Sequence, residues 1–177
     1  MDTHMLARPE RFFEDRFGLT SSALERLLGT QLAGRVDHAD LFLEYRISEE
    51  LTLEEGAVKK ASRHVSQGAG IRWVSEIIEL AGGRDIFAEL RDKPSAAERV
   101  VEPSEVIRRD PQIILASWCG KPVDVAAIMR RPGWDRISAV RAGRIHEVDG
   151  ADILSPGPSL LAGLRHIHEI VQEGLRG

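Results

Sequence analysis

Residues 112–118, which read QIILASW, constrain the fold of this chain more than any other stretch. Their hydrophobic side chains follow one another without the polar alternation of a strand that has one face in water. Such a run is typical of a parallel strand with helices packed on both of its faces. We therefore expect this segment at the centre of an α/β sheet.

Helical and strand-like segments alternate along residues 73–177. An amphipathic helix is expected over residues 74–81 and stops at Gly82-Gly83, and further helices are expected from a cap at Ser104 to Asp110, over 123–129 and over 159–175. The segment GRIHEVD at 143–149 reads as the next strand. Alternating helices and strands predict a parallel sheet covered by helices.

The first 72 residues follow a different pattern. A leucine stripe predicts a helix over residues 21–33, and after it apolar residues alternate with polar ones, as at Leu41, Leu43, Leu51 and Leu53. This part reads as a helix followed by an antiparallel β-meander, whose apolar face needs the helices at 21–33 and 74–81 as cover. The predicted fold class is α/β, with this N-terminal segment (1–72) joined to a parallel-sheet lobe (73–177) at GAGIRW.

Composition excludes several classes of function. The 177 residues carry a net charge of −4, and basic residues are interspersed with acidic ones, so we expect no nucleic-acid partner. The pairs Arg108-Arg109 and Arg130-Arg131 are expected at solvated helix ends. Cys119 is the single cysteine, which excludes an internal disulfide. No apolar run approaches the length of a signal peptide or a membrane helix, so we expect no membrane insertion and, as written, a cytosolic chain.

Catalytic patterns are missing from the sequence. No Ser-His-Asp or paired-carboxylate arrangement stands out, and His166 and His168 are two residues apart, a spacing that does not place two zinc ligands on one helical face. We therefore expect no enzyme activity, no metal site and no covalently bound cofactor.

The segment ADLFLEYRISEELTLEEGAVKKASRHVSQGAGIR resembles the N-terminal region of the TldD/PmbA metallopeptidases over residues 23–72. That family's zinc site lies on an HExxxH-type helical motif, which this chain lacks. The resemblance therefore implies a non-catalytic fragment or partner of a TldD/PmbA-type assembly, and no peptidase chemistry.

The motifs RWVSEIIELAGGRDIF, SEVIRRDPQIILASWCG, PGWDRISAVRAGRIHEVDG and SPGPSLLAGLRHIHEIV occur in the order found in another family. They resemble the C-terminal lobe of the BtuF-like binding proteins of ABC importers for cobalamin and iron siderophores, over residues 73–177. The resemblance implies a lobe of the periplasmic-binding-protein (class III) type, cobalamin or a ferric siderophore as ligand, and an ABC permease as partner. Members of that family are mostly periplasmic or lipid-anchored.

Candidate ligand-binding residues follow from the strand order. Trp118, Cys119 and Gly120 end the buried strand, where open parallel sheets place their ligands, and an indole there would lie against a flat macrocycle. The alternative makes Trp118 a core or rim residue and Cys119 a small hydrophobic one. By resemblance, Asp152, Ile153 and Leu154 border the same cleft.

Two further positions are compared with the family. Arginines usually flank the Pro-Gly-Pro of the SPGPS stretch, where this chain has Ser155 and Ser159, and serine offers only one hydroxyl. Glu105 matches the surface glutamate that docks onto permease arginines. Its alternative role is that of a first-turn glutamate favoured by the helix dipole.

Three functions therefore stay open. The chain is a binding module for a corrinoid or siderophore, binding weakly or as a homodimer. Alternatively it is a partner of a TldD/PmbA-type protein, or a recombined chain, natural or chimeric, with no native ligand.

Overall fold

The computed structural model describes residues 39–46, 67–118, 122–154 and 157–176, together with 18, 20, 22, 23 and 26. The helix expected at 21–33 lies largely outside these residues, and Leu51 and Leu53 of the expected meander lie outside them. None of the described helices is long and apolar enough to cross a membrane.

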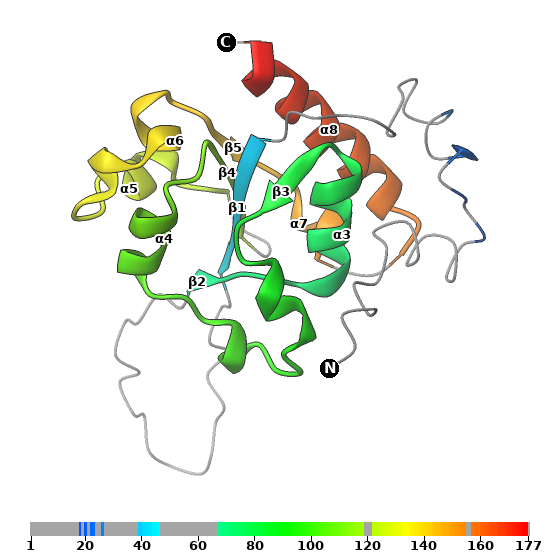
Figure 1. Ribbon diagram of the computed structural model, residues 1–177, viewed down its shortest axis with the longest axis horizontal. Coiled ribbons are helices and arrows are strands. Elements are labelled where there is room, and N and C mark those ends of the chain that lie inside the picture. Colours follow the sequence, from blue (N-terminus) through cyan, green and yellow to red (C-terminus); the bar gives the residue numbers. More distant parts are fainter. Residues whose placement is uncertain are drawn as a thin grey trace, which may run out of the picture.

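A largely parallel sheet forms the centre of the described structure (Figure 1). Its strands are β1 (Ala39–Arg46), β2 (Gln67–Gly68), β3 (Gly83–Asp85), β4 (Ile113–Trp118) and β5 (Ile145–Glu147). β1 pairs in parallel with β4 on one side and with β3 on the other, and β4 pairs in parallel with β5. The predicted α/β class with a parallel sheet is confirmed.

Among the residues that the structure describes, β1 pairs antiparallel with the two residues of β2, Tyr45 opposite Gly68 and Arg46 opposite Gln67. Along its other edge, six consecutive residues of β1 pair in parallel with β4, from Leu41 opposite Ile113 to Arg46 opposite Trp118. The strand that was expected to begin a meander is thus the central strand of the parallel sheet. Both parts of the chain therefore contribute to one sheet.

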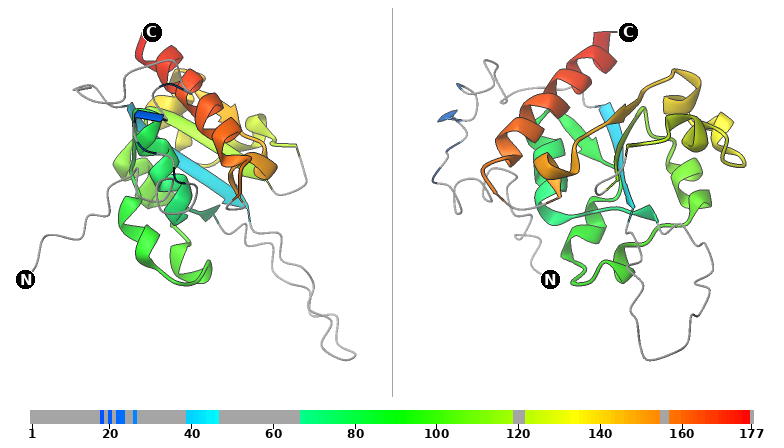
Figure 2. Two further views of the ribbon diagram at one scale, coloured as in Figure 1. Left: turned by 90° about the vertical axis from the view of Figure 1, so that its right-hand side faces the viewer. Right: turned by 180° about the vertical axis from the view of Figure 1, so that it is seen from behind.

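Helices cover both faces of the sheet (Figures 1 and 2). One face is covered by α3 (Arg72–Leu80), α7 (Gly150–Ile153) and α8 (Leu160–Arg176). The other carries α4 (Pro103–Arg109), α5 (Val125–Met129), α6 (Ser138–Arg141) and the short 3₁₀ turns η1 (Ala88–Asp92), η2 (Ala97–Arg99) and η3 (Trp134–Arg136). This arrangement explains why the strand at 112–118 is apolar on both faces: five of the six residues of β4 are buried.

The side chains of β1 alternate between two hydrophobic clusters. Leu41 and Leu43 pack in the cluster that α3 and α8 cover, as expected for α3. Phe42 points to the opposite cluster, where its ring lies edge-on to Phe87 and Trp134 with centroids 5.5 Å and 6.4 Å apart. Because strand side chains alternate between faces, one strand supplies both cores.

The ends of two helices test the sequence predictions, and one prediction agrees with the structure while the other does not. α3 ends at Leu80, and Gly82 follows with φ of 93°, as the double glycine predicts. α4 begins one residue before Ser104, at Pro103, and no side chain caps it, so the prediction of a Ser104 cap was wrong. Proline is favoured at the first helical position because its fixed φ is helical and its missing N–H has no intrahelical partner there.

The join at 68–73 connects β2 to α3. Gly70 adopts φ of 66°, and a Cβ at this position would lie 2.6 Å from Cβ of Leu90 and 2.9 Å from the Phe87 carbonyl oxygen. Only glycine fits so close to another segment with this backbone conformation.

Candidate functional site

The carboxyl ends of β1, β4 and β5 meet at one edge of the sheet, which we call the carboxyl edge. Trp118 ends β4, and α7 begins three residues after β5 ends at Glu147. The two segments are close, because a Cβ on Gly150 would lie 3.5 Å from Oγ of Ser117. Trp118 and the segment that holds Asp152, Ile153 and Leu154 therefore both lie at the carboxyl edge, although Trp118 packs with one hydrophobic cluster and Ile153 with the cluster on the other face of the sheet. Cys119, Gly120 and Ser155 lie outside the described residues.

Trp118 is half-buried at this edge. Its indole packs against the cluster around Phe42 and Trp134, so it belongs in part to the core while its remaining surface faces solvent. Ser117 beside it is fully buried. Contact between Trp118 and a ligand stays a prediction.

The three predicted residues of the α7 segment have different environments. Ile153 is fully buried in the cluster under α8, whereas Asp152 and Leu154 are half-buried. The carboxylate of Asp149 caps the turn by accepting from the Ala151 amide at 2.8 Å. Of the three, Asp152 is the one with a polar side chain, and its contact with a ligand stays a prediction.

Residues from three other parts of the chain touch α7. The indole N–H of Trp73 donates to the Ile153 carbonyl at 2.8 Å, and the hydroxyl of Ser159 donates to the Ala151 carbonyl at 2.9 Å. At Gly163 on α8, a Cβ would lie 2.6 Å from the Asp152 carbonyl oxygen. Trp73 carried no functional expectation, because a contact between residues 80 positions apart leaves no periodic signal in the sequence.

Glu105 lies in the first turn of α4 and is held by two arginines. It accepts from Arg108 at 2.8 Å and 2.5 Å and from Arg109 at 2.8 Å. These charged hydrogen bonds, first from Arg108 and then from Arg109, lower the pKa of Glu105 to about 2. The carboxylate is therefore ionised and partly exposed, but its charge is already matched within the protein.

The expectation that both arginine pairs are solvated was wrong for one member of each. Arg109 donates to the Ile86 carbonyl and pairs with Glu89 at 2.6 Å, and its guanidinium lies 4.3 Å from the centroid of the Phe87 ring. Arg131 pairs through two nitrogens with Glu44, and its side chain is only 14% exposed.

Glu44 is fully buried on β1, on the face that carries Phe42. The Arg131 guanidinium that neutralises it lies 4.4 Å from the centroid of the Trp134 ring. This pair was not predictable from the local pattern. The alternation of polar and apolar residues places Glu44 on the solvent-facing side of the strand, whereas in the structure both faces of the sheet are covered.

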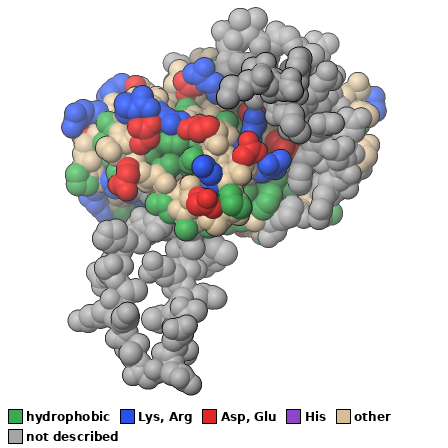
Figure 3. Space-filling view, turned by 60° about the horizontal axis from the view of Figure 1, so that its bottom comes forward, with side chains coloured by type: hydrophobic (Ala, Val, Ile, Leu, Met, Phe, Trp, Pro, Cys, Tyr) green, Lys and Arg blue, Asp and Glu red, His purple; other side chains and the backbone are tan. Residues whose placement is uncertain are grey.

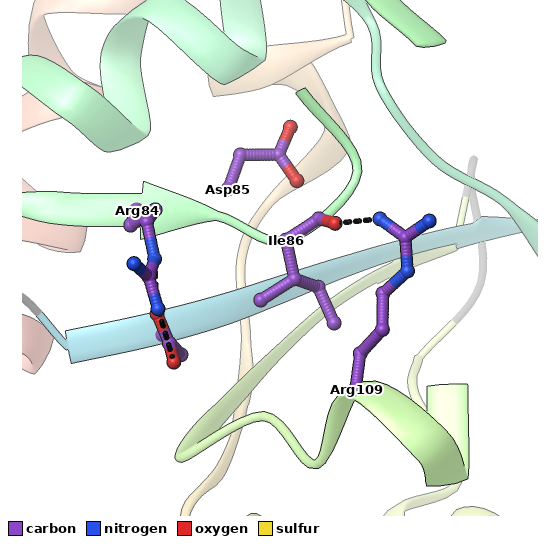
Figure 4. A pocket seen from close by; sticks show the side chains of 5 residues that line it. Arg84, Asp85, Ile86 and Arg109 are labelled. Atoms are coloured by element: carbon purple, nitrogen blue, oxygen red, sulfur yellow. Dashed lines mark hydrogen bonds and ion pairs between the residues drawn. The ribbon is translucent and has the colours of Figure 1, made fainter. Parts of the chain in front are cut away.

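A shallow hollow of about 370 Å³ lies near the amino end of β1, at the opposite end of that strand from Trp118 (Figure 4). It is lined by Asp40, Arg84, Asp85, Ile86 and Arg109. Arg84 pairs with Asp40 through two hydrogen bonds of 2.6 Å and 2.8 Å. Both guanidinium groups are therefore already neutralised, and the hollow offers no unmatched charge to a ligand.

Burial raises the pKa of the Asp85 carboxyl, and hydrogen bonds from the Ser75 hydroxyl and the Phe87 amide oppose the rise. Asp85 lies two residues after the double glycine, and nothing in the local pattern marks it as buried. Among the described residues, no three His, Cys, Asp or Glu side chains are grouped so that they could hold a metal ion.

Charges of both signs are spread over the described part of the face that Figure 3 turns toward the viewer. Hydrophobic side chains lie between them, and no extended patch of one sign is seen on this face.

The model of the family described as periplasmic binding protein matches residues 54–151, more than half of the chain. The match begins within the segment that resembles TldD/PmbA and ends inside α7. No curated protein sequence matches the chain.

Solved structures share the fold. An ABC-type Fe³⁺-hydroxamate transport system from Saccharomonospora viridis is 18% identical, with a TM-score of 0.59 over 84% of this chain and 47% of that one. The periplasmic heme-binding protein RhuT from Roseiflexus sp. is 18% identical, with a TM-score of 0.58 over 94% and 55%. The periplasmic vitamin B12 binding protein BtuF of Vibrio cholerae is 20% identical, with a TM-score of 0.55 over 87% and 51%.

The chain thus spans about half the length of the solved proteins that it matches. Its parallel sheet, its helical cover on both faces and the family match over residues 54–151 agree. The chain belongs to the periplasmic binding protein family.

Proposed function

We propose that the chain is a substrate-binding module of an ABC importer and that it binds a corrinoid, a ferric siderophore or a heme at the carboxyl edge. The observation that supports this proposal is the position of both Trp118 and the α7 segment at that edge, where Ser117 lies beside the start of α7. An indole and a carboxylate at one edge suit a large planar or chelate ligand that is held by apolar contact and a few polar groups. The proposed role is binding without catalysis.

A single lobe offers one face to its ligand. Small-molecule sites usually bury most of the ligand surface, and the chain spans only about half the length of its structural relatives. We therefore propose that binding is weak in a single copy, or that a second copy completes the cleft as a homodimer. Sedimentation velocity with and without ligand distinguishes the two forms.

Calorimetric titration tests the binding proposal. Cyanocobalamin, a ferric trihydroxamate and hemin are titrated separately into the protein and into the Trp118→Ala and Asp152→Ala variants. Arg84→Gln, at the opposite end of the sheet, is the matched control. The proposal expects one compound to bind the parent and the control equally and both site variants more weakly. No heat with any of the three, or equal binding by all variants, would contradict it.

We also propose that Glu105 docks the module onto basic residues of the permease. Charged groups at such a rim mainly set orientation and association rate. Glu105→Arg should slow association with a reconstituted vitamin B12 or siderophore permease, whereas Glu102→Arg, an exposed residue just before the same helix, should change it less. Equal association rates for the two variants would contradict the docking role and leave Glu105 a role within its own helix.

A second candidate rests on the resemblance of residues 23–72 to TldD/PmbA proteins. In it, residues 1–72 form a segment of separate origin in a natural or constructed chimera, and the chain joins a TldD/PmbA assembly or has no native ligand. Co-purification with a TldD/PmbA protein would support this candidate, and separate elution in size exclusion would oppose it. The binding-module proposal places the chain in the periplasm, and the cytosol is the compartment of this alternative; cell fractionation separates them.

A further inference from the structure

Three residues that do not belong to the candidate site contact the α7 turn. Trp73 reaches it from α3, while Ser159 and Gly163 reach it from the segment that forms α8. The two hydrogen bonds go to the carbonyls of Ala151 and Ile153, which are the residues on either side of Asp152 in the chain.

Gly163 sets the distance between α7 and α8. A Cβ at this position would lie 2.6 Å from the Asp152 carbonyl oxygen and 2.7 Å from Cγ2 of Ile153. The first of these atoms belongs to the backbone, so it can move away only if the whole turn moves. Ile153 is fully buried beneath the same helix and fixes the turn from its inner side.

Ser159 has a defined task in this arrangement. The resembled family usually carries an arginine at this position, whereas here the serine hydroxyl is engaged by the Ala151 carbonyl. Loss of a ligand-directed arginine is thus accompanied by a contact that fixes the neighbouring turn.

We propose that Trp73, Ser159 and Gly163 are positioning residues that hold α7, and with it Asp152, in the place where the carboxyl edge meets its ligand. This inference rests on the proposed function for its ligand, but the hold on α7 is a property of the protein alone. A residue that acts through geometry should affect ligand affinity without touching the ligand, because the polar contact it orients is lost when the turn moves.

The test compares two glycines on one helix. Gly163→Ala places a methyl group against α7, whereas Gly174→Ala places one 2.7 Å from Cδ1 of Ile113, at the start of β4 and away from the carboxyl edge. Gly174→Ala therefore reports the cost of crowding α8 by itself. Trp73→Phe and Ser159→Ala remove one hydrogen bond each and add no bulk, and Ser159→Thr keeps the hydroxyl at an exposed position.

The first readout is amide hydrogen exchange of the ligand-free chain at Asp152 and Leu154, whose amides bond within the turn to Asp149 and Gly150. We expect Gly163→Ala and the double variant Trp73→Phe/Ser159→Ala to raise exchange at these amides by about tenfold, and Gly174→Ala and Ser159→Thr to leave it within about twofold of the parent. Unchanged exchange in the first two variants would overturn the proposal.

The second readout is the affinity for cyanocobalamin, a ferric trihydroxamate or hemin, whichever binds the parent in the calorimetric test. Affinity should fall about tenfold in Gly163→Ala and in Trp73→Phe/Ser159→Ala, and in Ser159→Thr it should equal that of the parent. An equal fall in Gly174→Ala would overturn the proposal, since general crowding would then explain the loss. A parent that binds none of the three compounds contradicts the proposed function, and the exchange comparison still decides whether α7 is held as proposed.

Discussion

Two acidic side chains on neighbouring strands are buried, and the protein accommodates them differently. Glu44 forms an ion pair with two guanidinium nitrogens of Arg131. Among the described residues, the Asp85 carboxyl accepts hydrogen bonds from the Ser75 hydroxyl and the Phe87 amide, and burial raises its pKa. A buried carboxylate is stable when a cation matches it, and otherwise it tends toward the protonated form.

Arg131→Met should destabilise the fold strongly, because it leaves Glu44 as a buried charge without the guanidinium. Removal of one partner from a buried ion pair typically costs about 3–5 kcal/mol. Urea unfolding measures the change, with Arg130→Met, its exposed neighbour, as the matched control. The double variant Glu44→Gln/Arg131→Met should recover part of the loss. A loss no larger than that of Arg130→Met would show that the pair is not essential.

Asp85→Asn should change how stability depends on pH. The folded chain holds the Asp85 proton above the pH at which the unfolded chain releases it, so this group makes the fold less stable as pH rises from the ordinary aspartate range through its raised pKa. Asparagine removes that decline, so the variant should gain stability relative to the parent as pH rises. Urea unfolding at a series of pH values measures this difference, and a constant difference would contradict the raised pKa.

At the scale of single elements, long periodic segments were predictable and short ones were not. α3, β4 and α8 lie close to where their apolar periods place them. β3 and η1 were not separated in the sequence, because three residues of strand followed by a 3₁₀ turn contain too few side chains to define a period. The start of α4 was misplaced because a proline, and no side-chain cap, begins it.

Asp110 links the end of α4 to the start of α6. It adopts φ of 45°, and its carboxylate accepts from the amide and the hydroxyl of Ser138 at 2.6 Å and 2.9 Å. Asp110→Ala should cost about 2 kcal/mol, because alanine disfavours this backbone conformation and leaves the first amide of α6 without its acceptor. Asp110→Gly should cost less, since only the acceptor is lost, and Asp110→Asn should stay near the parent. Thermal unfolding measures the stability of all three variants. Equal losses of stability for alanine and glycine would show that the backbone conformation of Asp110 does not contribute.

At the scale of the whole molecule, the central position of β1 determines which pieces can fold. Trp118 ends β4 at the carboxyl edge, as the buried strand before it predicts, because the carboxyl ends of parallel strands meet there. The role of the α7 segment rested on the family resemblance and stays a prediction. The contacts of Trp73 with Ile153 and of Arg131 with Glu44 were not predictable, since each joins residues at least 80 positions apart. Local patterns fix elements, but such pairs exist only after the elements have packed.

A fragment of residues 71–177 should not fold by itself. Without β1, the inner edge of β4 loses its partner strand, and the helices α3 and α8 lose Leu41 and Leu43 from their shared core. We expect a disordered or aggregated fragment by circular dichroism and size exclusion. Cooperative unfolding of this fragment would show instead that 1–72 and 73–177 are separate domains.

The three tryptophans occupy environments that an optical experiment would separate. Trp134 is fully enclosed and stacked by a guanidinium, so dissolved quenchers cannot reach its ring. Trp73 and Trp118 are only partly enclosed, one beside α7 and the other at the tip of β4. Fluorescence emission from Trp134 therefore serves as a constant internal standard. A molecule that binds at the carboxyl edge would change the emission of Trp73 and Trp118 relative to it.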